Sequence, residues 1–122
     1  MESSTKSESK ERRRAQYLIR RIRKFLFEGN WAVRFSVVGE DEAICRRYEI
    51  APTSIGFCDY ETQTLHVHYK KDILVIVIHE ALHALYPDND EEETLRLEQL
   101  VLDHLGPRQA RNIMIALLLR LE

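Results

Sequence analysis

The sequence Ile73-Leu-Val-Ile-Val-Ile-His-Glu-Ala-Leu-His-Ala-Leu-Tyr86 contains the motif His-Glu-x-x-His, formed by His79, Glu80 and His83. On an α-helix, residues four positions apart lie one turn above each other on the same face. This spacing lets both imidazoles reach one metal ion, with Glu80 beside them as a carboxylate that can take a proton from water. Such a short motif also arises by chance, but histidines beside an apolar run are costly unless they are used. The stretch therefore predicts a metal site.

The apolar run that precedes His79 fits either a buried strand or a buried helix. Its β-branched residues favour a strand, and periodicity alone cannot separate the two. However, the turn signal Lys70-Lys71-Asp72 comes before the run and none follows Ile78. We therefore predict one helix over 72–85, with Asp72 as its N-cap. Because this helix is apolar nearly all round, it is expected to be central and buried.

The rest of the chain is expected to fold around this helix as one small domain. With 122 residues, 44% of them hydrophobic, the chain is long enough for a single core. Residues 1–9 are polar and are expected to be disordered, which leaves 10–122 for the domain. The expected elements are a helix over 11–27, strands over 31–38 and 43–50, a hairpin over 54–60 and 64–69, and helices over 72–85, 90–105 and 107–121. The predicted fold class is α+β: an N-terminal helix, a small, three- or four-stranded, mostly antiparallel sheet, and three helices.

A catalytic zinc site usually has three protein ligands, so the histidine pair needs a partner. Glu98 lies near the middle of the apolar face of the helix over 90–105, where a buried carboxylate needs a metal or a cation. We therefore predict Glu98 as the third ligand, with an ion pair to an arginine as the alternative. Glu91 projects to nearly the same side but begins the helix, and His104 sits at the edge of the apolar face. Both remain alternatives, whereas Glu92 and Glu93 point away and suit the helix dipole.

Other polar residues have simpler interpretations. His66 and His68 lie two apart and share one strand face, which we interpret as the less buried face; a role in contacting substrate stays open. Cys45 and Cys58 lack C-x-x-C spacing and are expected to be ordinary buried or half-buried thiols in a reducing cytoplasm.

With zinc on His79, His83 and Glu98, the remaining coordination position would hold water. The ion lowers the pKa of that water and polarises a substrate carbonyl, while Glu80 takes the proton and returns it to the leaving amine. The predicted reaction is metal-assisted amide hydrolysis without a covalent intermediate. Tyr60, Tyr69 and Tyr86 are candidates for stabilising the oxyanion.

The motif His79-Glu-Ala-Leu-His83, preceded by Thr64-Leu-His-Val-His-Tyr69 and followed by a Glu-rich helix with Glu98, resembles the minimal zincin-like metallopeptidases of the ImmA/IrrE and SprT-like types. The resemblance covers roughly residues 54–105. It implies an active-site helix packed on a small antiparallel sheet, zinc, and cleavage of protein substrates, in a phage or mobile-element setting. The chain departs from both types, because no histidine follows soon after His83 and no helix-turn-helix region is attached.

Charge and hydropathy restrict the partners. The net charge is −2, and there is neither a membrane-length apolar stretch nor a secretory signal, which indicates a cytoplasmic protein that binds no membrane. The basic face of the first helix suggests weak nucleic-acid contact, although such faces are commonly just solvated. Its basic residues are Arg12, Arg13, Arg14, Arg20, Arg21, Arg23 and Lys24. The rival to a peptidase is an inactive zinc-binding, nucleic-acid-binding or protein-interaction module of similar fold.

Overall fold

The computed structural model describes residues 2–36, 46–47, 56–69 and 72–121. Over these residues the fold is mixed α and β, with the predicted order of an N-terminal helix, strands, and three further helices. The elements are α1 (Glu2–Glu28), β1 (Ala32–Ser36), β2 (Gly56–Asp59), β3 (Thr64–His68), α3 (Ile73–Leu85), α4 (Glu91–His104) and α5 (Pro107–Arg120).

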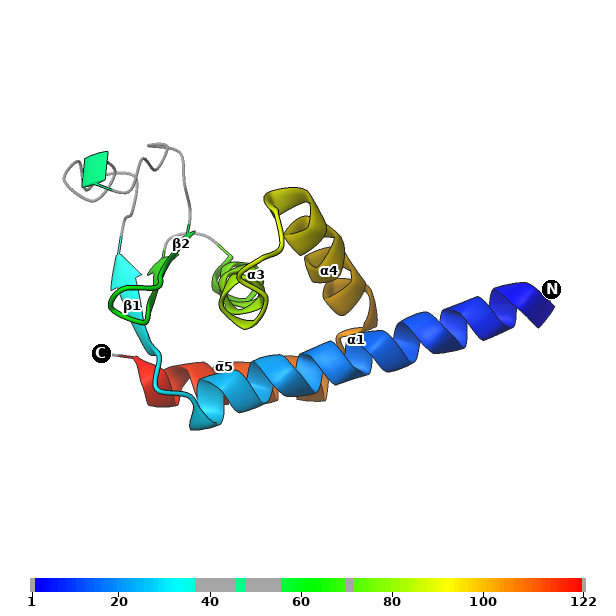
Figure 1. Ribbon diagram of the computed structural model, residues 1–122. Coiled ribbons are helices and arrows are strands. Elements are labelled where there is room, and N and C mark those ends of the chain that lie inside the picture. The colour runs from blue at the N-terminus through cyan, green and yellow to red at the C-terminus, as the bar shows by residue number, and fades with distance from the viewer. Residues whose placement is uncertain (1, 37–45, 48–55, 70–71, 122) are drawn as a thin grey trace.

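Helix α3 is the centre of the structure, between the sheet on one side and α4 on the other (Figure 1). The segment Ile73–Leu85 is one helix, so the prediction of a helix rather than a strand is confirmed. Asp72 occupies the N-cap position, but its side chain makes no capping hydrogen bond. The side chains of Val77, Ile78 and Ala81 are fully buried. The β-branched residues of this segment have only modest helix propensity. Burial on nearly all sides stabilises the helix by more than this low propensity costs.

The two helices after α3 begin where the sequence predicts them. Asp90 caps α4, its carboxylate accepting a hydrogen bond of 2.8 Å from the Glu93 amide. Pro107 occupies the first turn of α5, and the Gln109 side chain accepts a 3.0 Å hydrogen bond from the Gly106 amide. Both ends follow the usual chemistry of helix N-termini. Helix α5 runs along α1, and Arg120 donates hydrogen bonds to the carbonyls of Leu26 and Phe27 (Figure 1).

Helix α1 is longer than the sequence predicts. It begins at Glu2 instead of Glu11, so the segment expected to be disordered continues the helix. Neither proline nor glycine interrupts this segment, and residues of fair helix propensity extend a helix whose later turns are already packed. Among the side chains of α1 that the structure describes, from residue 7 onward, the first buried one is that of Ala15. The N-terminal part of the helix projects beyond the remaining elements (Figure 1).

The sheet has the strand order β1-β3-β2. Strands β2 and β3 form the predicted hairpin and are antiparallel, but β1 pairs with β3 in parallel, so the described strands form a mixed sheet and not a mostly antiparallel one. A short hairpin loop imposes antiparallel pairing, whereas the long connection between β1 and β3 imposes no direction. Of the strand predicted over 43–50, the structure describes only Arg46 and Arg47, which are helical. At the other edge of β1, Val33 forms a single bridge with Leu121.

One face of the sheet packs on α3. A Cβ atom added at Gly56 would lie 2.8 Å from Ile76 Cγ2, so Gly56 faces α3. Cys58 follows two positions later, and the pairings Gly56 with Val67 and Cys58 with Leu65 place Leu65 and Val67 on the same face. The opposite face carries Phe57 and His66, which are also paired. The sheet therefore supports α3 directly below the residues of the His-Glu-x-x-His motif.

Candidate metal centre

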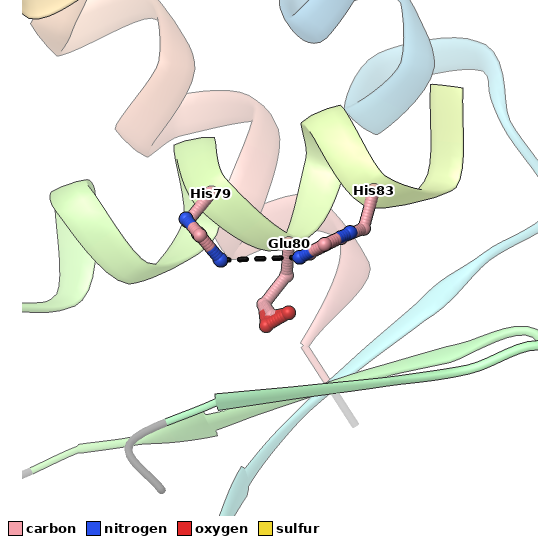
Figure 2. Close-up of side chains that lie close together, drawn as sticks. All are labelled: His79, Glu80 and His83. Carbon is pink, nitrogen blue, oxygen red and sulfur yellow. Dashed lines mark hydrogen bonds between the residues drawn. The ribbon is translucent and has the colours of Figure 1, made fainter. Parts of the chain in front are cut away.

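Helix α3 brings the two histidines of the motif together. The Nε2 atoms of His79 and His83 lie 3.1 Å apart, and Figure 2 shows the two rings directed toward one another from successive turns. Their side chains are 18% and 20% exposed, so both imidazoles are held by packing but remain reachable from solvent. Together with Glu80 they form a group that could hold a metal ion, with candidate ligand atoms within 4.8 Å of one another.

Glu91, the first residue of α4, lies against both imidazoles. Its Oε1 atom is 2.8 Å from His79 Nε2, and its Oε2 atom is 2.8 Å from His83 Nε2. Two imidazole nitrogens and one carboxylate thus converge on one point, which is a donor set that suits zinc. The Glu91 side chain is 61% exposed, so this side of the centre is open to solvent.

Glu98, the predicted third ligand, lies behind the centre. Its Oε1 atom is 3.6 Å from Nδ1 of His79, the ring nitrogen opposite the one that meets Glu91. The side chain is 14% exposed, and burial raises the pKa of this carboxyl, while the neighbouring His79 opposes the rise. Glu91, and not Glu98, therefore contacts both Nε2 atoms, and Glu98 as the third ligand stays a prediction. A carboxylate on the second ring nitrogen suits the role of orienting a ligating histidine.

Helix geometry explains why Glu91 contacts the Nε2 atoms where Glu98 was expected to do so. They are seven residues apart, so both project from nearly the same side of α4 toward α3. The sequence favoured Glu98 because it is surrounded by core positions, and it discounted Glu91 because helix ends fray. In the structure the Asp90 cap fixes the first turn of α4, and this turn lies next to the histidine pair. The position of each glutamate along the axis of α4 decides which carboxylate contacts the Nε2 atoms. Helical periodicity does not predict which part of α4 lies next to the histidines.

Glu80 is buried below the histidines. Its exposed fraction is only 5%, and Figure 2 shows its carboxylate directed toward the sheet. Burial, followed by the charges of Glu91 and Glu98, raises the pKa of Glu80 to about 8. A carboxyl group with a pKa near neutrality is suited to exchanging protons with a reacting group.

The sheet below Glu80 leaves room for this carboxylate. A Cβ atom added at Gly56 would lie 3.0 Å from Glu80 Oε2 and 3.1 Å from Glu80 Cγ. Cys58, on the same face, is buried, and burial together with the charge of Glu80 raises the pKa of its thiol to about 12. The prediction of an ordinary buried thiol is therefore confirmed for Cys58, whereas Cys45 lies outside the described residues.

The three tyrosines considered for the oxyanion make other contacts. The Tyr60 hydroxyl donates a 2.8 Å hydrogen bond to the His83 carbonyl, and its ring meets Trp31 edge to face with centroids 5.8 Å apart. The Tyr86 hydroxyl accepts a 3.1 Å hydrogen bond from Arg21. The Tyr69 ring lies 6.5 Å from that of Phe35. Tyr60 thus anchors the last turn of α3, and a role for any of these hydroxyls in catalysis stays a prediction.

The remaining candidates lie away from the centre. His104 ends α4, about 20 Å along the helix axis from Glu91, and its carbonyl accepts a hydrogen bond from Gln16. Glu93 pairs with Arg96, in agreement with its predicted surface role. His66 is on the sheet face opposite α3, where its ring stacks on Phe57. His66 is 7% exposed and therefore buried, but Leu65 and Val67 on the other face are 0% exposed. The expectation that the histidines lie on the less buried strand face is therefore confirmed.

Comparison with protein-family models, with curated proteins and with solved structures finds no match to this chain. The resemblance to the zincin-like peptidases therefore rests on the motif and its surroundings. Within the described residues, none of the helices has the length and apolar character required to cross a membrane.

Proposed function

We propose that this chain is a zinc-dependent metallopeptidase in which His79, His83 and Glu91 hold the metal ion. The observation that supports the proposal most strongly is the meeting of the Glu91 carboxylate with both Nε2 atoms at 2.8 Å. Glu98 is the orienting carboxylate of His79 in this proposal. The proposed ligands are two imidazole nitrogens and one carboxylate, and zinc commonly binds both kinds of group in proteins.

The positions of the side chains suggest the role of each in hydrolysis. When bound, zinc acts as a Lewis acid and lowers the pKa of a water molecule at its open position. Glu80 is the general base, because it follows His79 directly in the motif and its carboxylate lies close to both histidines. Glu80 then returns the proton to the leaving amine, so that one carboxyl serves both halves of peptide hydrolysis.

The rival, a purely structural zinc module, fits the site less well. Structural zinc ions are usually enclosed by four protein ligands, whereas catalytic ions keep one position open. Here three ligands converge, and the most exposed of them, Glu91, faces solvent. A fold of the zincin-like type would place such an opening beside the substrate, and we propose this fold assignment together with the activity.

The proposal is tested by following hydrolysis of a mixture of unstructured peptides by mass spectrometry. Zinc-loaded protein is expected to cleave peptides, chelation is expected to stop cleavage, and added zinc is expected to restore it, because the metal is bound reversibly by deprotonated ligands. A His79→Ala/His83→Ala variant is the control for contaminating proteases. Equal cleavage by this variant, or cleavage that persists after chelation, would contradict the proposal.

Replacement of Gly56 by alanine is expected to impair hydrolysis while zinc stays bound. The added methyl group would press on the Glu80 side chain and on Ile76 Cγ2, and a displaced general base costs on the order of tenfold or more in rate. Zinc affinity and peptide turnover are measured on the same preparation. The second variant, Gly56→Ala with Ile76→Ala, removes the contact with Ile76 and leaves the contact with Glu80. If the double variant recovers full turnover, Gly56 serves only core packing.

A further inference from the structure

The solvent-facing side of α1 carries a stripe of positive charge that the proposed peptidase activity does not use. Residues 10–24 contain eight of the 18 lysines and arginines of the chain and only Glu11 of its 20 acidic residues. The other segments therefore share ten basic and 19 acidic residues. Charge is segregated in this molecule, and the basic part is concentrated on one helix.

Five of these side chains form one continuous stripe, which we call the basic face. Lys10, Arg13, Arg14, Arg20 and Lys24 follow one another at spacings of three, one, six and four residues. These spacings place all five on the same side of the helix over a length of about 21 Å. All five are exposed, and Tyr17, 50% exposed, lies among them. The basic face consists of Lys10, Arg13, Arg14, Arg20 and Lys24.

The opposite side of α1 packs against the other helices. Ala15, Leu18 and Ile22 are at most 3% exposed, and α1 contacts α3, α4 and α5 through this side. Residues 7–14, in contrast, are exposed, and this part of the helix projects past α4 and α5 (Figure 1). The packing of the core therefore does not require the projecting turns, and they present the first part of the basic face without steric obstruction.

From these observations we infer that the basic face of α1 binds the phosphate backbone of double-stranded DNA, with the projecting helix along the major groove. An α-helix with its side chains is about 10–12 Å across, and the B-form major groove is about 12 Å wide. The deep, narrow major groove of an RNA duplex does not admit a helix. Arginine, which provides three of the five side chains, binds phosphate oxygens through two parallel hydrogen bonds.

An anionic membrane is a poorer partner for this helix. Helices that lie on membranes bury an exposed apolar face among the lipids. The apolar face of α1 is already used against the other helices, and the basic face offers the lipids a single aromatic side chain, that of Tyr17. The DNA inference is also independent of the proposed metal centre, since none of the five residues belongs to it.

The test is fluorescence anisotropy of the full-length protein with a labelled DNA duplex of about 20 base pairs, titrated between about 50 and 200 mM salt. A dissociation constant in the micromolar range and a salt slope of about −4, corresponding to four or five phosphate contacts, are expected. Arg13→Glu with Arg20→Glu should weaken binding at least tenfold and reduce the slope by about two. The matched control, Arg108→Glu with Arg111→Glu on exposed positions of α5, makes the same charge change and should weaken binding less than about threefold.

Several outcomes would overturn the inference. One is the absence of binding to the DNA duplex at low salt, and another is an equal loss in the α1 and α5 double variants. Preference for an RNA duplex, or for phosphatidylserine vesicles, over DNA would assign the basic face to a different partner. Retention of binding by Arg13→Lys with Arg20→Lys would support a contact through charge, and chelation of zinc should leave binding unchanged. Circular dichroism of each variant separates loss of contact from loss of folding.

Discussion

Replacing Glu80 with glutamine will lower peptide hydrolysis by at least about a hundredfold, because general acid–base catalysis contributes about 10²–10⁴ to such rates. Glutamine has nearly the same shape but cannot accept the proton. Because the proposed ligands are His79, His83 and Glu91, zinc should bind this variant as tightly as it binds the wild type. Turnover of a cleavable peptide and zinc content are measured on the same sample.

The matched control for this variant is Glu92→Gln. Glu92 is an exposed glutamate on the first turn of α4, next to Glu91, and the substitution removes the same charge. It is expected to leave turnover within about twofold, since the effect of an exposed charge is screened by solvent and salt. Unchanged hydrolysis by the Glu80→Gln protein would show that another group takes the proton and would refute the assigned mechanism. Loss of zinc from this variant would instead assign Glu80 to metal binding.

Removal of the Glu91 carboxylate is expected to weaken zinc binding more than removal of Glu98. Glu91→Ala deletes a ligand, whereas Glu98→Ala deletes a group that orients a ligand, and loss of an orienting group costs about 10–100-fold in metal affinity. We expect a loss of more than about a hundredfold for Glu91→Ala. Competition with a chromogenic chelator measures both affinities, and Glu92→Ala serves as the control for the charge of the α4 N-terminus.

The order of the two effects separates the sequence-based assignment from the structural one. If Glu98→Ala lost zinc and Glu91→Ala kept it, the prediction of Glu98 as the third ligand would be confirmed and the proposed role of Glu91 would be wrong. The 3.6 Å separation between Glu98 Oε1 and His79 Nδ1 is longer than a hydrogen bond, so the loss of zinc affinity for Glu98→Ala is expected near the lower end of the range for an orienting group, about tenfold. A combined Glu91→Ala/Glu98→Ala variant should lose more affinity than either single variant, because the two carboxylates contact opposite nitrogens of one imidazole.

Local chemistry made much of this molecule predictable. The His79-x-x-x-His83 spacing fixes two imidazoles on one side of a helix whatever surrounds them, and the Nε2 atoms are 3.1 Å apart in the structure. Asp90 and Pro107 mark helix starts through capping and backbone restriction, which act within a few residues. The hairpin of β2 and β3 has a short loop that dictates its direction. Each of these features depends on neighbours in the sequence.

Features that depend on distant contacts were not predictable in the same way. The parallel pairing of β1 with β3 joins strands far apart in the chain, and no turn signal encodes its direction. Which of Glu91 and Glu98 meets the histidines depends on how far along its axis α4 crosses α3. The stacking of the His66 ring on Phe57 joins two strands and is likewise not encoded next to His66 in the sequence. Hydrophobic periodicity predicts on which side of its own helix or strand a side chain lies. It does not predict which other helix or strand packs against that side.

The most direct test of the central claim is the zinc content of the purified full-length protein, determined by mass spectrometry of the metal after dialysis without chelator. The wild type should hold close to one zinc ion per chain, because three deprotonated ligands that converge in the folded state bind zinc tightly. His79→Ala/His83→Ala should hold almost none. Less than about half an equivalent in the wild type, or equal zinc in the double variant, would contradict a metal centre formed by His79, His83 and Glu91.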